Sequence, residues 1–251
     1  MTVTTAVILA AGRGVRLGER GLARPKGFLQ LGDRPIIEES LARLFAAGIE
    51  RVVIATGHEA EQYEALARRL GPERRIELAH NERFAESGSM YSLYRARALV
   101  REDFLLLESD LIYEQRALTA LLEDPRRDAL LLSGFTQAGD EVFVETDERG
   151  ELVDMSKQRG RLGPRIAGEL VGITKVSIEL FEGMLAFATE RFEETLYVDY
   201  ETDALVAAAR LHAVPCLVVP DLVWAEIDDE PALARAKRSI YPRLDLKRAP
   251  R

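Results

Sequence analysis

A short apolar segment followed at once by a glycine-rich loop is the feature that most limits how this chain can fold. Residues 4–10 (TTAVILA) are uncharged and partly β-branched, which predicts a buried strand. Residues 11–18 (AGRGVRLG) follow directly, so small side chains stand where the strand ends. In an open parallel sheet, ligands collect at the carboxyl ends of the strands, and the N–H groups of small residues approach phosphates closely. The sequence therefore predicts an α/β fold with an anion site after its first strand.

The chain beyond this loop alternates short apolar runs with longer amphipathic stretches. In the first half we expect strands at residues 51–56, 75–79 and 104–108, and helices at residues 36–47, 59–70 and 89–100. This alternation is typical of a mostly parallel central sheet flanked by helices, with right-handed crossovers. Shorter runs predict a small antiparallel extension at residues 129–134, 141–146 and 152–156. Later strands are expected at residues 170–176, 214–219 and 223–227, helices at residues 178–188, 203–211 and 230–240, and a frayed end at residues 247–251.

Composition excludes several classes of protein. The 251 residues are 47% hydrophobic, which is enough for a sizeable core. The net charge of −8 argues against a nucleic-acid partner, and no apolar run reaches the ~20 residues of a membrane span. A single cysteine, Cys216, excludes an internal disulfide, and together with three histidines it leaves no credible zinc cluster. We therefore expect one cytoplasmic domain without a membrane span, and the sequence leaves the oligomeric state open, a homodimer included.

The charge of the first 34 residues indicates a polyphosphate partner. This segment carries a net charge of +4, so the remaining 217 residues carry −12. The loop is not a dinucleotide fingerprint, because Leu17 stands where the third glycine would be. It is not a Walker A loop either, because no Gly-Lys-Ser/Thr closes it. The alternative to a phosphate site is an ordinary glycine turn with solvated arginines.

Two stretches of the N-terminal segment resemble the signature of the sugar-phosphate and small-alcohol-phosphate nucleotidyltransferases. They are residues 9–18 (LAAGRGVRLG) and residues 24–27 (RPKG). The resemblance implies a Rossmann-like nucleotidyltransferase fold in which the loop wraps a nucleotide triphosphate, while Arg16 and Lys26 neutralise its charge. The nucleotide-binding residues that it implies in the loop are Leu9, Ala10, Ala11, Gly12, Arg13 and Gly14.

The acids at the end of a central strand are candidates for a metal site. Residues 105–110 (LLLESD) are an apolar strand that ends in acids. A carboxylate there would face the ligand crevice, where Mg²⁺ can bridge it to phosphates. Asp110 is the first candidate, and Glu108 alternates onto the same face. The alternative for Asp110 is a turn acid or a helix cap.

A second acidic segment, residues 224–229 (WAEIDD), lies near the C-terminus. Glu226 and Asp228 share one face of an extended segment and can point at one cation together. The segment resembles the phosphocholine cytidylyltransferase branch of the superfamily, which implies that Asp110, Glu226 and Asp228 bind Mg²⁺. The alternative is that these acids only cap the last helix, which is what we expect of Asp229.

Residues 81–95 (NERFAESGSMYSLYR) resemble the same branch, above all at residues 92–94 (SLY). The stretch departs from the branch at Ser89, where an asparagine is expected. Small polar residues suit contacts to a pyrimidine, so the nucleotide contacts expected here are Ser87, Gly88, Ser89 and Ser92. The alternative is a loop with a helix cap at Ser87 or Ser89.

Two further segments are candidates for binding a second substrate. In the superfamily, a lysine placed like Lys157 contacts the phosphate being joined, and Arg159 beside it suits an anionic acceptor; the alternative is an exposed basic loop. Residues 197–203 (YVDYETD) mix aromatic and acidic side chains, which suit a cationic head group. The acceptor-binding residues expected there are Tyr197, Asp199, Tyr200 and Glu201. The alternative is the start of a helix.

The resemblance to these nucleotidyltransferases implies a Mg²⁺-dependent cytidylyltransferase. It would transfer CMP from CTP to a small phosphate or phosphonate, such as phosphocholine or 2-aminoethylphosphonate, and release pyrophosphate. We expect a single domain in which residues 1–112 bind the nucleotide and residues 113–251 supply the acceptor site and the C-terminal metal segment. A sugar-1-phosphate nucleotidyltransferase and a non-catalytic nucleotide-binding module are the alternatives. Because Trp224 is the single tryptophan, a primary amine or an uncharged acceptor head is favoured over trimethylammonium.

Overall fold

The strands of the main sheet follow the order β10-β6-β9-β4-β1-β2-β3 in the computed structural model, which describes residues 3–18, 21 and 23–244. Four neighbouring pairs are parallel (β1 with β2, β1 with β4, β2 with β3, and β6 with β10), whereas β9 runs antiparallel to β4 and β6. The strands are β1 (Thr5–Ala10), β2 (Arg51–Thr56), β3 (Arg75–His80), β4 (Phe104–Glu108), β6 (Ala129–Ser133), β9 (Ile166–Val176) and β10 (Cys216–Val219). The prediction of a mostly parallel sheet is confirmed.

Two short antiparallel pairs extend this sheet. Strands β7 (Phe143–Thr146) and β8 (Leu152–Ser156) form a hairpin that joins the main sheet through β9. Strands β5 (Leu111–Tyr113) and β11 (Trp224–Glu226) pair with each other, and so bring a C-terminal segment beside the end of β4. The expected antiparallel extension is therefore present, although β6, which was expected in it, belongs to the main sheet.

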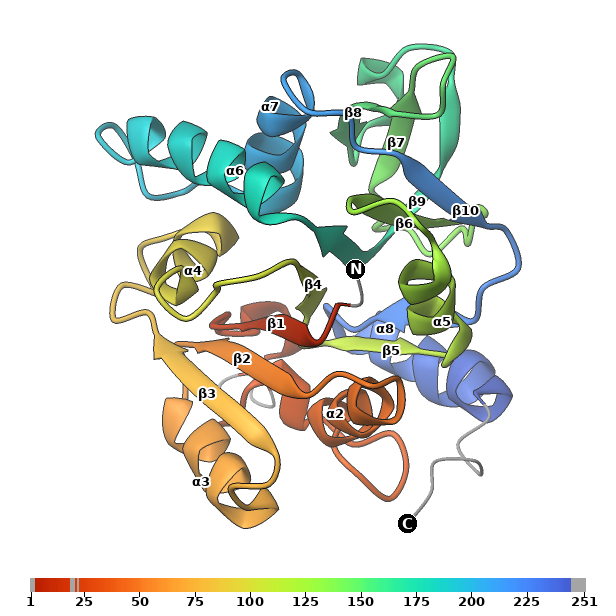
Figure 1. The fold of residues 1–251 in the computed structure, drawn as a ribbon. Coiled ribbons are helices and arrows are strands. Elements are labelled where there is room, and N and C mark those ends of the chain that lie inside the picture. Colours follow the sequence, from red (N-terminus) through yellow and green to blue (C-terminus); the bar gives the residue numbers. More distant parts are fainter. Residues whose placement is uncertain (1–2, 19–20, 22, 245–251) are drawn as a thin grey trace.

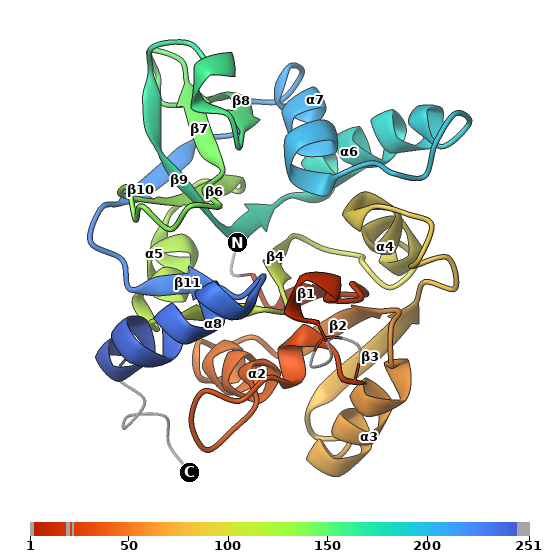
Figure 2. The ribbon, with the colours of Figure 1, turned by 180° about the vertical axis from the view of Figure 1, so that it is seen from behind.

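Helices cover both faces of the sheet, because alternate strand residues point to opposite sides. Val7 and Leu9 pack with α4 (Ser89–Ala96), α6 (Ile178–Arg191) and α7 (Val206–Ala209). Ala6 and Ile8 pack with α2 (Ile36–Ala46), α3 (Ala60–Leu70) and α5 (Arg116–Glu123) on the other side (Figure 1). The view from behind shows α8 (Glu230–Arg235) beside β11 (Figure 2).

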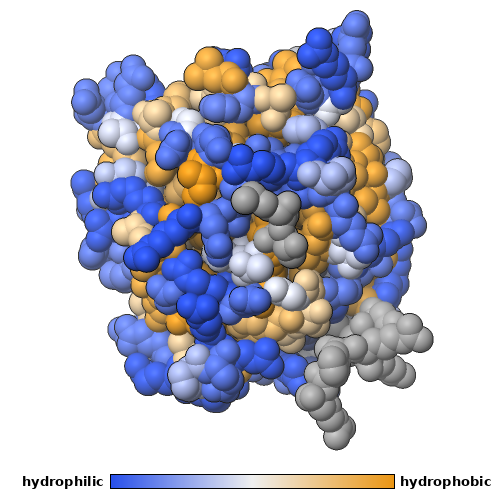
Figure 3. Space-filling view, viewed as in Figure 1, coloured by the Kyte–Doolittle hydropathy of each residue, from blue (hydrophilic) through white to orange (hydrophobic). Residues whose placement is uncertain are grey.

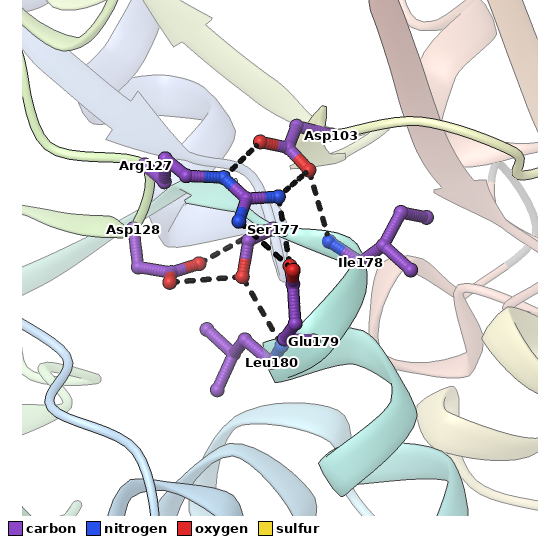
Figure 4. A network of polar contacts seen from close by, with 7 residues as sticks. All are labelled: Asp103, Arg127, Asp128, Ser177, Ile178, Glu179 and Leu180. Atoms are coloured by element: carbon purple, nitrogen blue, oxygen red, sulfur yellow. Dashed lines mark hydrogen bonds and ion pairs between the residues drawn. The ribbon is translucent and has the colours of Figure 1, made fainter.

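A polar network fixes the start of α6 against the start of β4 and β6 (Figure 4). Asp103 accepts hydrogen bonds from the Arg127 guanidinium at 2.8 Å. Asp128 accepts one from the Ser177 hydroxyl at 2.9 Å, and the same hydroxyl accepts one from Leu180 N at 3.1 Å and so caps the helix. The network lies away from the cavity described below and serves the packing of α6.

Several element boundaries differ from the sequence predictions. The sequence did not predict strand β5 or helix α5. Strand β5 gives no local signal, because it is three residues long and pairs with a strand more than 100 positions further along the chain. Helix α4 ends at Ala96, before the expected residue 100, and β9 begins at Ile166 rather than residue 170. The expected helix over residues 203–211 is wound more loosely at its start, as a π-helical turn over Tyr200–Leu205 that continues into α7. The end predicted at residues 247–251 lies outside the described residues.

The surface is mixed in character. On the face shown in Figure 3, hydrophilic residues cover the lower left, over α3, whose buried side chains are Tyr63 and Leu66. None of the helices that the structure describes is both long and apolar enough to cross a membrane.

Candidate active site

A cavity of about 730 Å³ opens at the carboxyl ends of β1 and β4. One wall is the loop after β1. The opposite wall comes from residues 154–158 at the end of β8 and from Asp199, Glu201, Thr202 and Asp203 at the start of the turn before α7. Its position is the one that parallel strands favour for ligands. Its size suits two small molecules side by side.

The loop after β1 turns sharply, and its residue Arg16 faces this cavity. Gly14 has a φ of 60°, a left-handed conformation that glycine adopts without steric cost. Arg16 and Lys26 line the cavity, as do the loop residues Leu9, Ala10, Ala11 and Gly12. Arg13 and Gly14, which were also predicted to bind the nucleotide, are not among the lining residues.

Lys26 and Arg16 are ion-paired to two of the predicted metal ligands. Lys26 Nζ lies 2.6 Å from Asp110 Oδ2 and also contacts Asp228 Oδ1, while Arg16 lies 2.7 Å from Asp228 Oδ2. Burial acts to lower the pKa of Lys26, but the two carboxylates raise it overall. Burial likewise opposes ionisation of Asp228, yet Lys26 and Arg16 hold the pKa of that carboxyl below its usual value.

Acids from distant parts of the chain meet because β5 pairs with β11. Glu226 lies opposite Leu111 in this pairing, and Ile227 N donates a hydrogen bond to Asp110 O at 3.1 Å. One carboxylate oxygen from each of three acids lies within 4.8 Å of the others: Glu108, Asp110 and Glu226. The sequence pointed to Asp110, Glu226 and Asp228, so the structure adds Glu108 to the group, whereas Asp228 is engaged by two cations.

Burial and the neighbouring acids oppose ionisation of Glu108 and Glu226 in this group. Burial, together with Asp110 and Asp228, raises the pKa of Glu226 to about 9. Burial and the nearby Glu201 and Glu226 raise the pKa of Glu108 well above its usual value. Carboxylate oxygens in such a group are the ligands that Mg²⁺ and other hard cations prefer. Asp229, beyond the group, accepts a hydrogen bond from Ala232 N at 2.8 Å, so its predicted role as a helix cap is confirmed.

The segment before α4 links the two sides of the cavity. The Asn81 amide donates hydrogen bonds of 3.0 Å to Ser87 Oγ and Ser92 Oγ. Ser89 Oγ donates to Asp199 Oδ2 at 3.0 Å and accepts from Tyr200 N at 2.9 Å. Ser87, Gly88, Ser89 and Ser92, for which nucleotide contacts are predicted, all line the cavity. Gly88 occupies the N-cap position of α4, and no side chain that the structure describes caps this helix. The alternative interpretation of Ser87 or Ser89 as a helix cap is therefore wrong.

Only part of the predicted acceptor site faces the cavity. Lys157, Asp199 and Glu201 line it. Asp199 begins a helical turn by accepting hydrogen bonds from Glu201 N and Thr202 N, which confirms the helix-start interpretation. Burial and the neighbouring Asp199 raise the pKa of Glu201 to about 8.

The other three predicted acceptor residues point elsewhere. Arg159 stacks over the rings of Phe135 and Phe143, at 5.1 and 5.8 Å. Tyr197 is 67% exposed. Tyr200 is buried behind the cavity, where its hydroxyl donates to Glu201 Oε1 at 2.7 Å. Polar lining residues that the sequence did not single out include Tyr63, Asp154, Gln158, Thr202 and Asp203. The sequence could have predicted Asp154, because it lies two positions before Ser156 and so shares one face of the expected strand with it.

A cationic loop after the first strand lies against acids at the end of a neighbouring parallel strand, which is the arrangement expected of a nucleotidyltransferase. The chain belongs to the MobA-like NTP transferase domain family, whose model matches residues 6–172. The predicted nucleotidyltransferase fold and class are thereby confirmed.

Known relatives and structures agree with this assignment. The chain is 31% identical to the CMP-5′-(3-aminopropyl)phosphonate synthase of Streptomyces rubellomurinus. The matched region covers 89% of this chain but 37% of that protein. It is 26% identical to the 2-aminoethylphosphonate cytidylyltransferase of Lancefieldella rimae, with 76% of this chain and 74% of that protein covered. The structure of the CTP:phosphocholine cytidylyltransferase of Streptococcus pneumoniae superimposes with a TM-score of 0.77 at 21% identity, covering 94% of this chain and 98% of that one, which shows the shared fold.

Proposed function

We propose that this protein transfers the cytidylyl group of CTP to a small phosphate or phosphonate and releases pyrophosphate. The observation that carries the proposal is the pairing of Arg16 and Lys26 with the acids at the ends of β4 and β11, inside one cavity. Two relatives are named for cytidylyl transfer to aminoalkylphosphonates or for its product, which supports CTP and this class of acceptor.

The two halves of the chain would divide the work. In the half formed by residues 1–112, the N–H groups of the loop after β1 would bind the triphosphate. Ser87, Gly88, Ser89 and Ser92 would contact the cytosine. In the half formed by residues 113–251, Lys157 and Arg161 would bind the acceptor phosphate, since both line the opposite wall.

The donor chemistry of the acid group fits Mg²⁺. Three carboxylate oxygens gather within 4.8 Å, and hard oxygen ligands are what this ion requires. Asp110, Glu226 and Glu108 would hold it, joined by Asp228 once Lys26 and Arg16 turn to the phosphates. When bound, Mg²⁺ neutralises phosphate charge and helps to align the reacting groups.

The residues of this chain would act on repulsion and alignment rather than on proton transfer. An acceptor oxyanion attacks the α-phosphorus, a new P–O bond forms, and the bond to pyrophosphate breaks with its electron pair leaving on the pyrophosphate oxygen. No general base is needed, because the nucleophile is already ionised. Each unit pair of like charges at ~4 Å costs about 4 kcal/mol at an effective dielectric near 20. Arg16, Lys26 and Lys157 would offset this cost and hold the groups in line.

A pyrophosphate-release screen of four nucleoside triphosphates against a panel of phosphates and phosphonates tests the proposal. We expect release with CTP and small phosphates or phosphonates. Release with hexose 1-phosphates instead would identify a sugar-1-phosphate nucleotidyltransferase. Tight CTP binding without release for any acceptor would identify a non-catalytic nucleotide-binding module.

A further inference from the structure

A second, smaller cavity lies directly behind the acidic wall of the substrate cavity. It measures about 30 Å³, and we call it the rear cavity. Glu108, Val142, Glu201 and Glu226 line both cavities, so these side chains are what lies between them. Glu169 and Trp224 line the rear cavity alone.

Glu169 brings an unpaired oxygen to this cavity. Glu169 is 1% exposed, and its Oε1 accepts a hydrogen bond from Thr136 N at 2.8 Å. Its Oε2 is fully buried and has no hydrogen-bond partner among the described residues. A buried carboxylate oxygen without a donor is costly, so this atom marks a position where a donor group belongs. Trp224 Nε1 is likewise buried without a partner in the described part of the chain, and a water molecule held beside a ligand would accept its hydrogen.

The residues that line the rear cavity indicate that this donor group is a cation. Arg235 is the one cationic residue among its described lining residues. Besides Glu108 and Glu226, which the proposed function assigns to Mg²⁺, four further acids line the cavity: Asp140, Glu141, Glu169 and Glu201. A cation with N–H donors would satisfy both the excess of acids and the unpaired Glu169 oxygen.

The size of the rear cavity selects among cations. A volume of about 30 Å³ has room for about two water-sized groups. A terminal methylene with its primary ammonium fits that space and offers three N–H donors. A trimethylammonium group has three methyls around the nitrogen and no N–H to donate, so it meets neither requirement. Among the described residues, Trp224 is the one aromatic side chain that lines this cavity, which falls short of the aromatic enclosure that such a group prefers.

We propose that the rear cavity binds the primary ammonium end of the acceptor and that Glu169 determines the preference for it. Val142 and Glu201, which line both cavities, would flank the chain of the acceptor, while its phosphate or phosphonate end would lie toward Lys157. This assignment rests on the proposed function and narrows its acceptor to primary aminoalkyl phosphates and phosphonates.

Calorimetric titration tests the assignment without requiring turnover. Three matched ligands are compared on the whole protein: 2-aminoethyl phosphate, phosphocholine and ethyl phosphate. Each is titrated with Mg²⁺, both without nucleotide and with α,β-methylene-CTP, which cannot release pyrophosphate. We expect 2-aminoethyl phosphate to bind at least about tenfold more tightly than either other ligand.

The variant Glu169→Gln keeps an acceptor for Thr136 N but removes the charge. We expect it to reduce the preference for 2-aminoethyl phosphate over ethyl phosphate about tenfold, whereas Glu148→Gln, at an exposed carboxyl paired with Arg165, leaves that preference unchanged. Equal or tighter binding of ethyl phosphate or phosphocholine by the unmodified protein, no binding of 2-aminoethyl phosphate, or a folded Glu169→Gln that keeps the full preference would each overturn the assignment. Because the ligand comparison needs no variant, it decides the question even if Glu169→Gln does not fold. The pyrophosphate screen decides the proposed function separately.

Discussion

Lys26 Nζ lies 2.6 Å from Asp110 Oδ2, so a cation assigned to the triphosphate neutralises an acid assigned to the metal. The same ammonium also contacts Asp228, which Arg16 holds from its other oxygen. A triphosphate would compete for both cations and release both carboxylates. In the proposed function, the nucleotide and the divalent cation therefore favour each other's binding.

Replacing Lys26 tests this competition. In Lys26→Met, the carboxylates of Asp110 and Asp228 lose their shared cation, so Mn²⁺ should bind the nucleotide-free protein at least about tenfold more tightly. Electron paramagnetic resonance of free Mn²⁺ measures this directly. Cytidylyl transfer should fall in the same variant, because the triphosphate loses a cation. Lys237→Met, at an exposed position, is the control. Unchanged or weaker Mn²⁺ binding in Lys26→Met would contradict the competition.

Asp110→Asn should abolish turnover while the protein stays folded. The amide retains an oxygen that can accept a hydrogen bond from Lys26, but it removes a charge from the acid group, so we expect kcat/KM to fall at least about a hundredfold. Steady-state pyrophosphate release and a thermal melt are the two measurements. Asp221→Asn, at a surface carboxyl that pairs with Arg116, should leave the rate unchanged. A rate near that of the unmodified protein would remove Asp110 from the metal site.

Glu201 should make the protein less stable as the pH rises. Burial and Asp199 raise its folded pKa from 4.5 to about 8, so the folded state retains a proton that the unfolded state loses. Its contribution to stability is complete below pH ~4.5 and is lost progressively up to pH ~8. Glu201→Gln should therefore lose less stability than the unmodified protein between pH 5 and pH 8, by at most about 1.4 kcal/mol per pH unit.

Urea unfolding at both pH values, without divalent cations, measures this difference. Glu193→Gln, at an exposed position, should follow the unmodified protein. Parallel pH profiles for Glu201→Gln and the unmodified protein would show that this carboxyl titrates normally.

Gly88 should not tolerate a side chain. A Cβ atom there would lie 2.2 Å from Val198 O, at the point where the segment before α4 docks on residues 196–198. Gly88→Ala should destabilise the protein by about 1–3 kcal/mol and weaken nucleotide binding, because the backbone must move. Gly160→Ala, where a Cβ meets nothing within 4 Å, is the matched control. Equal melting temperatures for the two variants would contradict the close packing at Gly88.

The sequence predicted the elements that depend on neighbouring residues better than the contacts that depend on distant strands. The strand at Thr5–Ala10 and its glycine loop follow from neighbouring residues, and the structure has them as expected. The approach of Glu226 to Asp110 came only from the resemblance to known enzymes, because it depends on the pairing of β5 with β11. Glu169 gave no signal, since its partner Thr136 is 33 positions away and its second oxygen matters only because nothing described pairs with it.

Lys157 and Arg159 are two positions apart, but the structure gives them different surroundings. Lys157 lines the cavity, whereas Arg159 lies over the rings of Phe135 and Phe143. Lys157→Met should raise the KM of the acceptor at least about tenfold while changing the KM of CTP little, because it removes a charge-assisted contact to one substrate only. Arg159→Gln should leave both KM values unchanged and cost about 0.5–1 kcal/mol of stability through its lost cation–π contacts. Initial rates over a grid of both substrates, with a melt of each variant, measure these effects. A rise in the acceptor KM for Arg159→Gln equal to that for Lys157→Met would mean that the loop turns Arg159 toward the acceptor during turnover.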